Sequence, residues 1–173
     1  NAAVSGSGDK TVNTLRVASG GSLALSSGTL TIAGGGIIGD SGASISGGNL
    51  TSGTNALYVH TPSALAISSA IVNGGASVTL FKACANTLTL SGANTYTGAT
   101  YVNSGTLALA GGALANGNVF VRGAAAFTMN SKALLPSPRV ARSTLIQSAS
   151  TKWSRRVSRA TTGAPLWAQS TPT

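Results

Sequence analysis

Short pairs of apolar residues, each pair separated by one small or polar residue, recur along residues 1–131 of this chain. Residues two positions apart lie on the same face of a β-strand, so each pair predicts a short strand with one apolar face. The pairs are Leu23/Leu25, Leu30/Ile32, Leu57/Val59, Leu65/Ile67, Val78/Leu80, Leu88/Leu90, Leu107/Leu109 and Phe127/Met129. Glycine, asparagine or serine follows within a few positions, as a chain needs at tight corners.

Strands this short cannot bury an apolar face alone, and the intervals between them are too short for helical crossovers. Stacking of successive coils buries every pair in one narrow core. The pattern therefore predicts an all-β fold, a parallel β-helix or β-solenoid. Hydrophobic residues make up 42% of the 173 positions and charged residues only 8%, so the chain has the apolar content to fold rather than stay disordered.

The composition changes sharply near residue 131. Residues 132–173 contain seven of the 11 lysines and arginines, neither of the two acids, and only one of the 23 glycines. We therefore predict two regions, a β-solenoid over residues 1–131 and a basic, non-repeat tail over residues 132–173.

The tail interleaves basic residues with an aromatic residue. Its candidate contacts to phosphate backbones or anionic lipid are Lys152, Trp153, Arg155, Arg156 and Arg159. Such clusters arise easily by chance, and a linker or a stretch translated out of frame has the same composition. We favour these two interpretations over nucleic-acid or membrane binding by the tail.

Residues 82–109 contain a longer motif. Residues 86–100 read NTLTLSGANTYTGAT, and VNSGTL follows at 102–107. This segment resembles the autotransporter-associated β-strand repeat over about 26 positions, beginning at a lysine. The motif residues are Lys82, Leu88, Leu90, Gly92, Asn94, Tyr96, Gly98, Thr100, Val102, Gly105 and Leu107.

The resemblance implies a right-handed parallel β-helix in the passenger region of a protein exported across a bacterial outer membrane. It also implies an extracellular or outer-surface location and no specific ligand. The chain departs from the pattern at Cys84 and Asn86, where glycine is usual. Asparagine tolerates positive φ fairly well and cysteine does not, so we expect the corner at Cys84 to be altered.

Catalytic residues are scarce. Gly39-Asp40-Ser41-Gly42 resembles the nucleophile motif of trypsin-like proteases, but His60 is the single histidine and it follows the serine. Asp9 and Asp40 are the only acids, too few for glycosidase or calcium chemistry. The sequence predicts no catalytic, metal or cofactor site, and places His60 at a solvated strand end.

Two further features have alternative interpretations. Cys84 is the single cysteine, which is more often a small buried residue than an intermolecular crosslink. Six threonines, if they all point outward, form a ladder that suggests ice binding. They are Thr87, Thr89, Thr95, Thr97, Thr100 and Thr106.

We therefore predict a non-enzymatic structural or adhesive module of a bacterial surface or secreted passenger. The chain starts at Asn1 rather than methionine, so we expect an excised or processed fragment. Exposed solenoid ends favour self-association into fibres, and a host or neighbouring-cell surface is a candidate partner. Binding of nucleic acid or lipid by the tail, and ice binding, are the alternatives.

Overall fold

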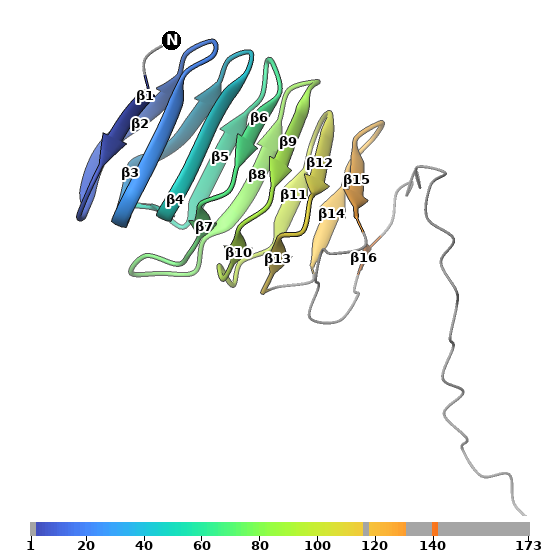
Figure 1. The fold of residues 1–173 in the computed structure, drawn as a ribbon. Coiled ribbons are helices and arrows are strands. Elements are labelled where there is room, and N and C mark those ends of the chain that lie inside the picture. Colours follow the sequence, from blue (N-terminus) through green and yellow to red (C-terminus); the bar gives the residue numbers. More distant parts are fainter. Residues whose placement is uncertain (1–2, 116–117, 131–139, 142–173) are drawn as a thin grey trace, which may run out of the picture.

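The computed structural model describes residues 3–115, 118–130 and 140–141, and these residues form strands joined by turns and irregular connections, with no helix among them. The strands stack in parallel into a β-solenoid of about six turns, whose coils lie side by side along one axis (Figure 1). The predicted all-β parallel solenoid is confirmed.

Each coil has three sides, and the early coils bend round the corners without breaking the strand. Successive stretches of β3 (Ser22–Gly39) pair with different strands: the first with β1 (Ala3–Gly6), the middle with β2 (Lys10–Val17), and the last with both β2 and β5 (Ala56–His60). Paired residues are 19 to 23 positions apart, as Leu90–Leu109 and Leu57–Leu80 illustrate. One coil therefore takes about that many residues.

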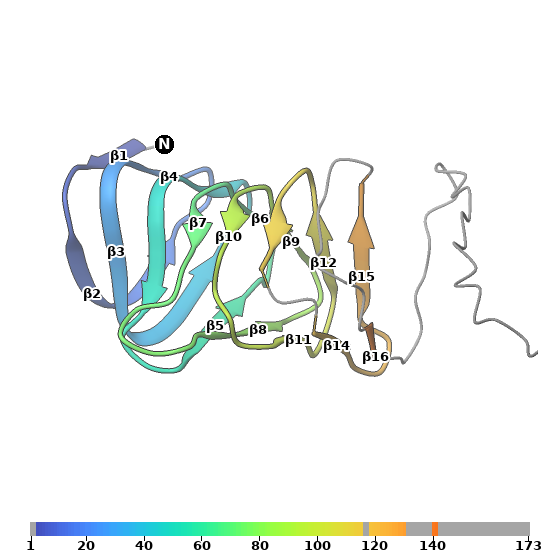
Figure 2. The same cartoon turned by 90° about the horizontal axis from the view of Figure 1, so that it is seen from below.

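The first side contains β1, the beginnings of β3 and β4 (Ala43–Ser52), β6 (Leu65–Ile67), β9 (Thr87–Leu90), β12 (Thr106–Leu109) and β15 (Ala126–Met129). The second side contains the beginning of β2, the middle of β3, the end of β4, β7 (Ala70–Ile71), β10 (Ala93–Asn94) and β13 (Ala113–Leu114). The third side contains the ends of β2 and β3, β5, β8 (Thr79–Ala83), β11 (Thr100–Val102), β14 (Val119–Val121) and β16 (Val140–Ala141). Figure 2 shows β5, β8, β11 and β14 following one another along the lower edge.

The core consists of columns of aliphatic side chains that run along the solenoid axis. On the first side, Ile45, Ile67, Leu90 and Leu109 lie in register in four successive coils and are all buried. The predicted apolar pairs all contribute to this core, with Leu23 and Met129 only partly buried against it. The alternation seen in the sequence is therefore the alternation between core and surface.

The strand β16 lies within the predicted tail and pairs in parallel with β14, Val119 with Val140. Residues 131–139 and 142–173 lie outside the described residues. The two-region boundary near residue 131 therefore stays a prediction. Within the described part of the chain, no helix has the length and apolar character needed to cross a membrane.

The assignment of these columns to the core can be tested by mutation. Replacing Ile67, which is completely buried between Ile45 and Leu90, by alanine leaves a cavity that neighbouring coils cannot close. We expect Ile67→Ala to lower the free energy of unfolding by about 2–5 kcal/mol in urea titrations. The matched control is Ala66→Ser at the adjacent outward position, which should change it by less than about 0.5 kcal/mol. Equal effects of the two substitutions would contradict the core assignment.

Candidate functional site

The repeat at residues 82–109 runs from the end of β8 through β12, and its apolar motif residues are core residues. Leu88 and Leu90 pair with Leu107 and Leu109 of the next coil, and Val102 pairs with Val121. All of them are buried, Val121 with slight exposure. The apolar part of the motif therefore fills columns, and the chemical interest lies in its polar residues.

Lys82 points into the core, in the column between Val59 and Val102, and none of its surface is exposed. Its Nζ donates hydrogen bonds to the carbonyl oxygens of Ala83 at 3.0 Å, Cys84 at 2.7 Å and Ser104 at 2.8 Å. An ammonium group has three donors, so this set satisfies it fully. Because Ser104 belongs to the following coil, Lys82 joins two successive corners of the solenoid.

The environment of Lys82 changes its acidity. Burial removes the ammonium group from water and lowers the pKa of Lys82 from 10.5 to about 8, although electrostatic attraction from Cys84 opposes the shift. With a pKa of about 8, Lys82 is still mostly charged at neutral pH. The three carbonyl oxygens stabilise this charged form in place of part of its water shell.

Asn94 connects three coils. Its side-chain oxygen accepts a hydrogen bond from the backbone N–H of Ile71 at 3.0 Å. Its amide nitrogen donates to the carbonyl oxygens of Gly92 and Ala113, both at 2.9 Å. Ile71 belongs to the coil before and Ala113 to the coil after. The buried amide therefore extends the backbone ladder at a position where β10 and β7 do not pair directly.

Tyr96 and Thr100 form a second buried polar pair. The Tyr96 hydroxyl and Thr100 Oγ1 lie 2.6 Å apart, and neither residue is exposed. Burial raises the pKa of the Tyr96 hydroxyl well above its usual range, while the hydrogen bond to Thr100 opposes the rise. The phenol therefore stays neutral and serves as a packed core group.

The position of Thr100 corrects the prediction of six outward threonines, because this one points inward. Thr87 pairs with Thr106, but Thr89 pairs with Ala66 on one side and Ala108 on the other. No continuous ladder of these six threonines forms, because Thr100 is buried and alanines lie above and below Thr89.

Two motif glycines are required by close approach of the neighbouring coil. A Cβ at Gly98 would lie 2.3 Å from the carbonyl oxygen of Val78, and one at Gly92 would lie 2.4 Å from that of Ser69. Gly105 has φ +67 and no room for a Cβ near Cys84. The glycines of the motif therefore allow coils to pass at backbone contact distance.

The corner at Cys84 keeps the glycine-like conformation despite the cysteine. Cys84 has φ 69 and is the one non-glycine residue with positive φ among the described residues. The expectation of an altered corner is therefore wrong. The carbonyl oxygen of Cys84 accepts from Lys82, and its Sγ lies 3.8 Å from Nδ1 of His60, an exposed residue at the end of β5 as predicted.

The candidate protease motif is a turn. Asp40 accepts hydrogen bonds from the Arg16 guanidinium, the shorter at 2.8 Å, and Gly42 has φ +70 in the bend between β3 and β4. Asp9 accepts from the backbone N–H of Thr29 at 2.8 Å. In the described part of the chain, no three His, Cys, Asp or Glu residues gather where they would hold a metal ion.

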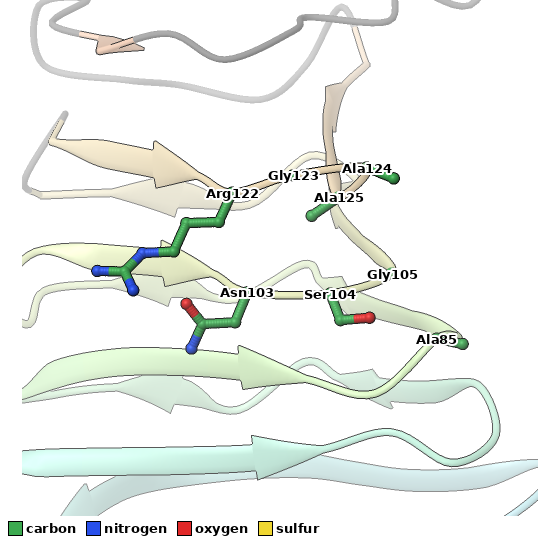
Figure 3. Close-up of a pocket in the computed structure, with 8 residues that line it drawn as sticks. All are labelled: Ala85, Asn103, Ser104, Gly105, Arg122, Gly123, Ala124 and Ala125. Carbon is green, nitrogen blue, oxygen red and sulfur yellow. The ribbon is translucent and has the colours of Figure 1, made fainter.

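A shallow hollow of about 520 Å³ lies at the corner beside the repeat. Figure 3 shows Arg122 and Asn103 extending to one side of it, with Gly105, Ala85 and Ala124 at the other end. Its lining is mostly glycine and alanine, and Arg122 lies over the Tyr101 ring, 5.5 Å from the centroid. The hollow therefore offers one cation and few groups to orient a ligand.

The structure reveals one feature that the sequence analysis did not identify. Tyr58, Phe81, Tyr101 and Phe120 form a ladder of stacked rings on the outer surface of the third side. Each ring lies between two inward-pointing residues of its strand, a signal that was available in the sequence.

The predicted anion contacts Lys152, Trp153, Arg155, Arg156 and Arg159 lie outside the described residues.

The fold defines a parallel β-solenoid whose distinctive motif is internal. The family model of the passenger-associated-transport-repeat matches residues 85–109, which confirms the predicted resemblance to an autotransporter passenger repeat. The repeat and the solenoid together fit a passenger domain of autotransporters, and this family suggests a secreted or outer-surface protein. No curated protein and no solved structure matches the chain.

Lys82 provides a pH-dependent test of its buried position. Between pH 8 and 10.5 the unfolded chain keeps a proton that folded Lys82 has released, so the free energy of unfolding should rise with pH. The rise attributable to Lys82 is on the order of 3 kcal/mol. Urea titrations at several pH values should show it in the wild type and not in Lys82→Met. The raised pKa of Tyr96 acts in the opposite direction above about pH 10, equally in both proteins. Parallel pH curves for the two proteins would contradict the assignment.

Cys84 provides a test of backbone strain. Replacing it by glycine removes the cost of a Cβ at φ 69, and we expect stabilisation by about 1 kcal/mol after the entropy of the unfolded glycine is counted. Thermal and urea unfolding measure this difference. Cys84→Ala is the matched control, because it removes the thiol and keeps the Cβ, and it should not stabilise. Stabilisation by alanine as large as that by glycine would show that the thiol, not the backbone, is the source.

Proposed function

We propose that this chain is a structural, non-catalytic segment of an exported bacterial passenger, a rigid rod of stacked coils that carries or spaces other surface elements. The observation that supports this best is the use of the motif's polar groups. Lys82, Asn94 and Tyr96 are all buried, and their hydrogen bonds run to backbone or side-chain atoms of this chain. A motif whose polar groups all bond within the chain holds the coils in register and leaves none of these groups free to act on a substrate.

The location of the remaining reactive groups agrees with a structural role. Asp40 is paired with Arg16, Asp9 is bound to the Thr29 backbone, and His60 lies beside Cys84 at a corner. None of these pairs contains the nucleophile, base and orienting group that acyl transfer needs together. Labelling of Ser41 in the full chain by a fluorophosphonate probe would contradict the proposal.

The role in an exported passenger is tested by surface display. The full chain is placed between an epitope tag and an autotransporter translocator, and surface epitope is measured by flow cytometry. We expect display of the wild type and a several-fold loss for Asn94→Ala, because that change breaks the link among three coils at a cost of about 2–4 kcal/mol. The outward control Ala108→Ser should be displayed like the wild type. If Asn94→Ala is fully displayed although the purified variant is shown to be unfolded, surface display does not depend on the stacking motif.

Self-association is a second candidate function for the isolated chain. In the described residues, β1 and β2 pair only with β3, so they present a free strand edge. Val12 and Leu15 lie beside this edge and are only partly buried. Such an edge pairs readily with another parallel coil. Sedimentation of a chain ending at Asn130 tests the idea, and a monomer independent of concentration would oppose it.

A further inference from the structure

The aromatic ladder on the third side is regular over four successive coils. Ring centroids lie 4.9 Å apart between Tyr58 and Phe81, 5.0 Å between Phe81 and Tyr101, and 4.9 Å between Tyr101 and Phe120. The paired ring planes are inclined by only 14°, 8° and 15°. The strands that carry them follow one another along one edge in Figure 2. Each inner ring therefore has a neighbour on both faces, and only its edge meets water.

The ladder stops at Tyr58, and the column continues without a ring. The register pairs Tyr58 with Gly36, and Gly36 with Thr14 of the first coil. One face of the Tyr58 ring is stacked on Phe81. The register places Gly36, which has no side chain, next to the other face. Tyr58 is 44% exposed, and Ile38, two positions after Gly36 and paired with His60, is 40% exposed. They are the two exposed large apolar side chains in the described part of the chain. The ladder therefore ends on an open aromatic face beside an open aliphatic one.

The fold does not require glycine at position 36. A Cβ there would meet only the Thr14 methyl, at an ordinary 3.6 Å, and its φ is not positive. The two preceding glycines differ, because a Cβ would lie 3.0 Å from the Asn13 carbonyl oxygen at Gly34 and 2.4 Å from that of Ala56 at Gly35. Gly36 thus leaves a slot of one missing side chain between Tyr58 and Thr14, in a column whose rungs are about 4.8 Å apart.

We propose that this slot binds one planar aromatic ring of a free aromatic compound, which completes the ladder. Such a ring would stack on Tyr58 as Phe81 does on its other face, with Ile38 along its edge. Its outer edge would remain in water, so phenols and indoles, with an apolar body and one polar group, suit the slot. A puckered sugar ring is thicker than the flat rings that this column accepts at each rung. This inference goes beyond the proposed function, which assigns no ligand to the rod.

The test uses p-cresol, the side chain of tyrosine, as the probe. In NMR titrations of the isotope-labelled full chain at millimolar p-cresol, we expect the Gly36 amide and the Ile38 methyl resonances to shift. Tyr58→Thr removes the stacking face and should weaken binding by about tenfold or more. Tyr101→Thr is the matched control, because it removes an equivalent ring from the ladder two coils away and should leave the titration unchanged.

Filling the slot gives the second half of the test. Gly36→Tyr should abolish the p-cresol shifts and raise the melting temperature, because it adds a fifth ring to the ladder. If Gly36→Tyr does not fold, Gly36→Val fills the slot with a strand-forming residue and should also abolish binding. Three results overturn the proposal: no shift in the wild type, shifts that persist in a folded position-36 variant, or equal losses in Tyr58→Thr and Tyr101→Thr. Shifts caused by methyl β-glucopyranoside and not by p-cresol would make the slot a sugar platform and overturn it as well.

Discussion

Every structural feature of this chain depends on the in-register parallel stacking of one coil on the next. Because paired residues are 19 to 23 positions apart, the neighbours of each side chain above and below it come from the adjacent coils rather than from nearby in the sequence. Backbone hydrogen bonds run between coils, and the core is a set of columns one residue wide. A single unsuitable residue therefore affects three coils at once, and compensation must come from within the same column.

Lys82 and Asn94 are two of the polar residues buried among these largely apolar columns, and hydrogen bonds to backbone atoms offset part of the desolvation cost of each. Lys82 replaces an aliphatic residue between Val59 and Val102, yet its ammonium group has a carbonyl oxygen for each proton. Asn94 stands in register with Leu114 and bonds to three coils. A buried polar group without such partners would cost more than it gives, so these contacts make the motif specific. They fix which coil lies on which, a choice that equivalent leucines cannot make.

The same in-register stacking also aligns side chains on the outer surface of the solenoid. Tyr58, Phe81, Tyr101 and Phe120 are outward residues that the register brings together, and Gly36 interrupts their column. The side chains of the repeat motif lie mainly in the core, so residues on the outer sides can vary without loss of the fold. A solenoid built in this way carries its stability in the inward alternation, while the residues of the outward columns are free of that constraint.

The sequence by itself determined the fold class and the core. Alternation with a period of two marks which residues share a strand face, and the apolar pairs identify the buried face without any knowledge of neighbours. The same alternation would have placed Lys82 and Thr100 inward, since Lys82 lies two positions after Leu80 and Thr100 two positions before Val102, whereas Thr100 was predicted to point outward. Only the tertiary structure decided how the coils align, because coil lengths vary and a change of one residue shifts every column. The aromatic ladder, the bonds of Asn94 to Ile71 and Ala113, and the positive φ of Cys84 all depend on that alignment. They arise from contacts about 20 residues apart, which local pattern does not encode.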